Sequence, residues 1–172
     1  MTLKILGIRP DKSVFITTAI SKEKLEKSRG REISDKEYEE KIWSDVKKSH
    51  FGGVEFRQLN DNDIPSDREF RDAWEDSQKG PQIDVCCTKA KAIALSKLRA
   101  ERNEELTKTD PDYMKALELD KDVTTIKAKR QKLRDATEPL KAIDTDGQFS
   151  NTSVLETLSS LSKLDNVLKN TE

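Results

Sequence analysis

The sequence has little of what metal sites and disulfide-rich domains are built from. Its 172 residues include two cysteines, one histidine and six glycines, and only 5% of the chain is aromatic. The cysteines, Cys86 and Cys87, are neighbours, whereas a disulfide framework needs spaced pairs. His50 and two adjacent thiols make a poor tetrahedral zinc site. We therefore expect no metal, no cofactor and a reducing compartment.

Motifs for catalysis are also missing. There is no glycine-rich phosphate loop, because only Gly52 and Gly53 are adjacent, and no serine lies in a nucleophile elbow. Cys86 or Cys87 could be a nucleophile at the start of a helix. Nothing in the sequence brings His50 beside either thiol. The sequence therefore predicts a protein that is not an enzyme.

Long apolar runs are absent as well. No run approaches the ~18 residues of a membrane span, and the first residues lack the apolar segment of a signal peptide, so we expect synthesis in the cytosol and no membrane partner. The chain is 33% hydrophobic and 38% charged. We expect an elongated, helix-rich molecule whose apolar surface is partly completed by other chains. The net charge of −1 gives no overall field for nucleic acid or lipid.

Residues 1–62 predict a small α/β domain. Segments 3–8 and 13–19 read as two strands, the second rich in β-branched and aromatic residues, and they flank a turn, which predicts a β-hairpin. Residues 21–32 are charged and form either a solvated helix or a mobile arm. Ser34 and Glu37 make a capping box, which predicts a helix to about residue 49. Alternation over 54–59 predicts a further strand, giving the order β-β-α-β.

Residues 64–74 predict a short capped helix. Ser66 and Glu69 have the spacing of a capping box, and an aromatic face follows at Phe70, Ala73 and Trp74. This face either packs into the protein's own core or docks onto a partner. In the second interpretation the contacting side chains are Arg68, Phe70, Arg71 and Trp74.

Residues 63–143 predict an antiparallel helical hairpin after that short helix. The first helix covers about 87–107, and Pro111 ends it and starts the next, with the turn at 108–111. Leucine and isoleucine at 119, 126, 133 and 140 then form a seven-residue repeat. Arg130 lies at an inner position of this seam, where it loosens the packing, extends to solvent or meets a carboxylate.

The second hairpin helix is basic. Between residues 121 and 134 it carries six basic residues and one acid, Asp122, and such a helix could meet phosphates. The facing helix carries Glu101, Glu104 and Glu105, which we expect to neutralise part of this charge. The sequence therefore argues against nucleic acid as a partner.

Residues 144–172 predict a linker and a separate C-terminal helix. The segment 143–149 has flexible-linker composition, and Ser153 with Glu156 forms a capping box. The apolar residues then recur every three positions, so the stripe winds around the helix. It either folds back on the hairpin or forms an oligomerisation and docking surface. The stripe consists of Leu155, Leu158, Leu161, Leu164 and Val167. In total the sequence predicts an α+β, predominantly helical fold.

Three segments carry a family resemblance: IPSDREFRDAW at 64–74, KAKAI at 89–93 leading into LRAER at 98–102, and KRQKLRD at 129–135. They resemble the C-terminal halves of small bacteriophage tail proteins, in particular tail-fibre-associated virion proteins. The resemblance covers about 64–143 and brings no catalytic residues with it. It implies a structural component of the virion, made in the host bacterial cytoplasm.

The resemblance further implies an adaptor between other phage structural proteins, which self-associates through the C-terminal helix. The hairpin also resembles phage tail-assembly chaperones, although these often have a tryptophan after the first helix, where this chain has Pro111, Asp112 and Tyr113. A soluble assembly chaperone is therefore the alternative. A small nucleic-acid-binding regulatory protein is the second alternative.

Overall fold

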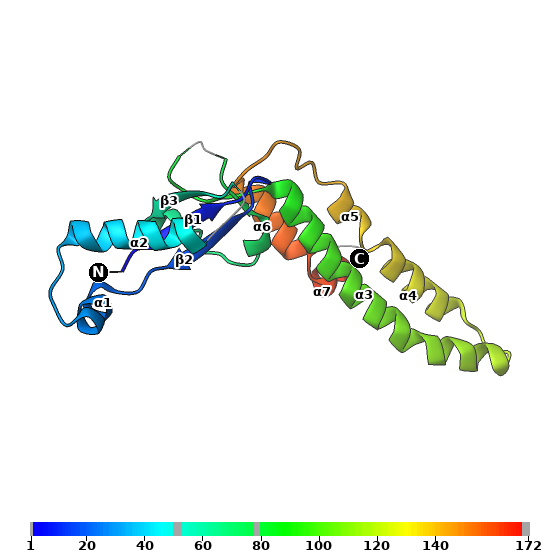
Figure 1. Cartoon of the computed structure of the whole chain (residues 1–172). Coiled ribbons are helices and arrows are strands. Elements are labelled where there is room, and N and C mark those ends of the chain that lie inside the picture. Colours follow the sequence, from blue (N-terminus) through cyan, green and yellow to red (C-terminus); the bar gives the residue numbers. More distant parts are fainter. Residues whose placement is uncertain (1, 50–52, 78–79, 170–172) are drawn as a thin grey trace. The chain divides into compact units, whose positions relative to one another are not determined.

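The structure is a computed structural model that describes residues 2–49, 53–77 and 80–169 (Figure 1). It confirms the predicted α+β, predominantly helical fold, with strands near the N-terminus followed by helices. The chain divides into two compact units. The first unit comprises residues 1–68 and 74–84, and the second comprises 69–73 and 85–172.

The first unit is built on a three-stranded antiparallel sheet. Its strands are β1 (Lys4–Ile8), β2 (Val14–Thr18) and β3 (Glu55–Leu59), in the order β2-β1-β3. Gly7 in the central strand lies opposite Phe15 and Phe56, whose rings meet edge to face with centroids 6.2 Å apart. A Cβ at Gly7 would lie 2.2 Å from the Phe15 ring, so only glycine allows the ring to cross β1.

Two helices, α1 (Lys22–Arg29) and α2 (Asp35–Ser49), form a common core with the strands. Residues 21–32 are thus a helix that ends at a left-handed Gly30, and not a mobile arm. Ser34 accepts a hydrogen bond from the Glu37 N–H at 3.1 Å, as the capping box predicted. The Tyr38 hydroxyl donates to the Ile20 carbonyl at 2.6 Å. The buried core cluster contains Leu3, Ile5, Leu25, Ile33, Tyr38 and Ile42.

The predicted capped helix at 64–74 is wrong. The chain forms short 3-10 turns, η1 (Asp61–Asp63) and η2 (Arg71–Ala73), and then strand β4 (Trp74–Glu75), which pairs with β5 (Asp84–Val85). Tertiary contacts override the capping signal. The Glu69 carboxylate binds Lys97 and Ser159, and the Ala73 carbonyl accepts from the Cys86 N–H at 2.9 Å.

The helical hairpin exists, but its predicted turn at 108–111 is wrong. Helix α3 (Cys87–Glu118) continues through Pro111, and α4 (Thr124–Asp135) follows after a turn at 119–123 (Figure 1). The turn is a Schellman motif. Asp120 adopts the left-handed conformation (φ 49°), and the Lys121 N–H donates to the Ala116 carbonyl at 2.9 Å. Asp122 then accepts from the N–H of Thr124 at 2.8 Å and starts α4.

Pro111 is tolerated inside α3 because the residues beyond it make tertiary contacts. A proline costs a helix interior about 3 kcal/mol. Ala116 is buried, and the Tyr113 ring lies 5.2 Å from the Arg130 guanidinium of α4. These contacts exist only if α3 extends past the proline.

The segment 143–149, predicted as a flexible linker, is held against the start of α3. The Lys91 ammonium donates to the carbonyls of Lys141 and Ile143 at 2.8 and 2.6 Å. The Thr88 hydroxyl donates to the carbonyl of Thr145, which is buried. Before it, α4 ends at Asp135, and the short helix α5 (Glu138–Lys141) has Pro139 in its first turn.

The C-terminal helix is two helices, α6 (Thr152–Leu161) and α7 (Leu164–Lys169). Asn151 caps α6, not Ser153 as predicted, because its side chain accepts from the Val154 N–H. The break has a tertiary cause: the Leu164 N–H donates to the Glu101 carboxylate of α3 at 2.9 Å, which fixes a new helix start. The second unit's core combines Phe70, Ala90, Ala94, Leu98, Leu133, Leu140, Leu158, Leu164 and Val167.

Candidate functional site

The residues predicted at 64–74 to contact a partner divide into two groups. Arg68 and Arg71 are exposed. Phe70 and Trp74 are 3% and 5% exposed, respectively. The aromatic side chains therefore have the burial of core residues, and only the two arginines present surface to another protein.

The C-terminal stripe is mostly used inside the second unit. Leu158, Leu164 and Val167 are buried, and Leu155 and Leu161 are half-buried. Helices α6 and α7 both contact α3. Alanines at 90 and 94 of α3 are fully buried, and their small side chains allow such close approach. In this conformation the stripe folds back on the hairpin.

An apolar surface that the sequence analysis did not identify lies at the end of the hairpin. Met114, Leu117 and Leu119 are 55%, 45% and 53% exposed, and we call these three residues the hairpin tip. The seven-residue repeat had placed Leu119 inside the seam. The turn chemistry of Asp120 and Asp122 could have revealed the tip, because a turn at 119–123 leaves these side chains without a facing helix.

Arg130 is the centre of a polar cluster between α3 and α4. Its guanidinium donates to the Asp110 carboxylate and to the Thr109 hydroxyl, the latter at 3.1 Å, and it lies over the Tyr113 ring. Of the three expected outcomes for Arg130, the structure shows the carboxylate partner. Arg130 also lines a surface hollow of about 490 Å³, which we call the α4 hollow.

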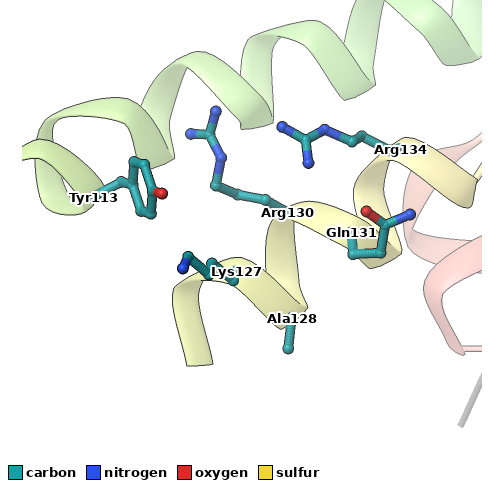
Figure 2. Close-up of a pocket in the computed structure, with 6 residues that line it drawn as sticks. All are labelled: Tyr113, Lys127, Ala128, Arg130, Gln131 and Arg134. Atoms are coloured by element: carbon teal, nitrogen blue, oxygen red, sulfur yellow. The ribbon is translucent and has the colours of Figure 1, made fainter. Parts of the chain in front are cut away.

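The α4 hollow is basic. Figure 2 shows Arg130 and Arg134 reaching from α4 toward α3, with the Lys127 amine on the side of Tyr113. Lys127, Arg130 and Arg134 follow one another by one turn of α4, so they share a face. The lining residues are Tyr113, Lys127, Ala128, Arg130, Gln131 and Arg134.

No family model, curated protein or solved structure matches this chain.

The structure also bears on metal binding, membrane spanning and thiol reactivity. Among the residues that it describes, no group of three or more His, Cys, Asp or Glu side chains could hold a metal ion. No helix within the described ranges is long and apolar enough to cross a membrane.

Burial raises the pKa of the Cys87 thiol, which favours the unreactive thiol over the thiolate. His50, its only candidate partner in the sequence, lies outside the described residues.

Glu69 connects three elements of the second unit. Its carboxylate accepts from the Ser159 hydroxyl of α6 and from the Lys97 ammonium of α3, the latter at 3.2 Å. The hydrogen bond from Ser159, assisted by Lys97, lowers the pKa of Glu69. A carboxyl group whose pKa is lower in the folded state stabilises the fold above its ordinary pKa, and this stabilisation is lost as the pH falls through the folded value.

We therefore expect Glu69→Gln to lower stability by about 1 kcal/mol at neutral pH and to flatten the loss of stability below about pH 4.5. The measurement is the melting temperature from circular dichroism between pH 3 and 7. Glu156→Gln, at an exposed position of α6, is the matched control and should keep the wild-type profile. Parallel profiles for wild type and Glu69→Gln would contradict the prediction.

Proposed function

We propose that this chain is a non-enzymatic structural component of a bacteriophage virion, associated with the tail or tail fibre. It acts as an adaptor that joins other virion proteins. The resemblance of residues 64–143 to small phage tail proteins supports this proposal. An adaptor needs no catalytic site, only surfaces that other proteins recognise.

The observation that carries the adaptor role is the hairpin tip. The structure describes four exposed large hydrophobic residues, and three of them lie within six positions, at 114, 117 and 119. In a chain that is 38% charged, such a concentration marks a protein contact. Lys115 and Glu118 alternate with the tip residues along the chain, so a contact through the tip would have charged residues beside its apolar centre. Its occupant is an apolar surface of another virion protein.

Self-association through the C-terminal stripe is part of the same proposal, on a smaller surface. The buried Leu158, Leu164 and Val167 are occupied within the second unit. Leu155 and Leu161, which are half-buried, are the stripe residues that a second copy could reach.

The test is quantitative mass spectrometry of purified particles from the phage that encodes the chain. We expect stoichiometric copies in the particle. Leu117→Lys should reduce incorporation at least about tenfold, because it places a charge in an apolar contact. Ile20→Lys is the matched control, since Ile20 is 46% exposed against 45% for Leu117.

Two results would overturn the adaptor role. Absence of the chain from mature particles, with binding to a tail protein before assembly, would assign it to the assembly chaperones. Equal incorporation of the Leu117→Lys and Ile20→Lys proteins would show that the hairpin tip is not the contact.

A further inference from the structure

Most of the basic charge of α4 is not neutralised by the acids of α3. Among the causes that lower the pKa of Glu105, its attraction to Lys129 of α4 is the smallest, and Lys129 does not line the α4 hollow. Glu104 and Glu105 form ion pairs with Lys108 of their own helix, at 2.9 and 2.7 Å. Glu101 accepts from the backbone of α7. These three acids therefore have their main partners within α3 and at the start of α7.

The cations of the α4 hollow keep free donors. Arg130 uses one terminal nitrogen, Nη1, for Asp110 and Thr109. In the part of the chain that the structure describes, Lys127 and Arg134 have no side-chain hydrogen bond or ion pair. The pKa of Asp122 is lowered chiefly by the hydrogen bonds from Thr124 and least by Lys127. The attraction between these two charges is therefore weak.

We propose that the α4 hollow binds a phosphate group, carried either by a small ligand such as a nucleotide or by a nucleic-acid strand. Lys127, Arg130 and Arg134 are the binding residues. This proposal is independent of the virion role, because it concerns α4 and not the hairpin tip.

The geometry favours phosphate over a weaker anion. Two guanidinium groups on one helix face offer planar forks of N–H donors, which match the oxygen atoms of phosphate, and a lysine adds a point charge. Arg130 is already oriented by Asp110 and by the Tyr113 ring, so less side-chain entropy is lost when it binds. The volume of about 490 Å³ lies in the range of small-ligand sites, roughly 300–1,000 Å³.

The experiment measures binding of two probes to the full chain. A fluorescein-labelled single-stranded DNA 20-mer is titrated by anisotropy at several salt concentrations. Inorganic phosphate is titrated by calorimetry. The test variant is Lys127→Glu with Arg134→Glu, and the matched control is Lys129→Glu with Lys132→Glu. All four side chains are exposed on α4, and each pair makes the same change in charge, but only the first pair lines the hollow.

We expect the test variant to lose at least about tenfold in affinity and to lower the salt dependence of DNA binding by about 1 for each residue replaced. The control pair should change the affinity by a smaller factor. If the 20-mer alone binds, the phosphate belongs to a nucleic-acid strand; if inorganic phosphate also binds and is lost in the test variant, the site takes small phosphorylated ligands. Equal losses in the two variants, or no binding of either probe, would overturn the proposal.

Discussion

Deleting residues 152–172 is expected to unfold the second unit. The deletion removes Leu158, Leu164 and Val167, which are almost fully buried, and each contributes about 1.5–3 kcal/mol through burial. Their sum, about 5–9 kcal/mol, is as large as the whole stability of many domains, about 5–15 kcal/mol. The apolar face of α3 at Ala90, Ala94 and Leu98 would then meet water.

Two spectroscopic signals separate the units in this experiment. Both tryptophans, Trp43 and Trp74, belong to the first unit, so tryptophan fluorescence reports on that unit. The helical signal at 222 nm is dominated by α3, α4, α6 and α7 of the second unit. We expect the truncated chain to lose most of the helical signal.

Single substitutions test the same packing without removing the helix. Leu158→Ala should lower the free energy of unfolding by about 2–5 kcal/mol, and Leu161→Ala, at a half-buried position, by clearly less. The core role would be contradicted by a truncated chain that keeps the helical signal of α3 and α4 and forms a smaller oligomer, as measured by light scattering. That result would instead support the prediction that the C-terminal stripe is an oligomerisation surface.

The sequence predicted the elements whose signals are local. The three strands of the first sheet and α2 were placed correctly because alternation over 54–59 and the capping of Ser34 lie within the elements themselves. The hairpin turn was misplaced because Pro111 is the strongest helix breaker in the region. Its effect is overridden by the contact of Tyr113 with Arg130, which lies later in the chain, and by the burial of Ala116.

Two further errors have one physical origin, which is that acidic side chains bind partners distant in sequence. Glu69 binds Ser159, 90 residues away, and so does not cap a helix at Ser66. Glu101 binds the backbone at Leu164, 63 residues away, and divides the C-terminal helix. The same change of partners leaves Lys127 and Arg134 without the acids that the sequence assigned to α4. No local pattern could have shown this.

Trp74→Ala is expected to lower the free energy of unfolding by about 3–5 kcal/mol, because the side chain is 5% exposed and its removal leaves a large cavity. Trp43 of α2 remains as the only fluorophore of its kind in this variant, and it reports unfolding in urea. A loss below about 0.5 kcal/mol, the level of surface substitutions, would instead favour a partner-contact role for Trp74.

Trp74→Phe is the informative companion, because the indole Nε1 is buried and has no hydrogen-bond partner among the described residues. Leaving a buried donor unpaired costs about 1–3 kcal/mol. Phenylalanine keeps an aromatic ring but is smaller than the indole, and this loss of packing lowers the stability. It also removes the unpaired donor, which raises the stability. We therefore expect Trp74→Phe to lose less than half of what Trp74→Ala loses. Equal losses would contradict the cost assigned to the unpaired donor, because removing it would then bring no compensating gain in stability.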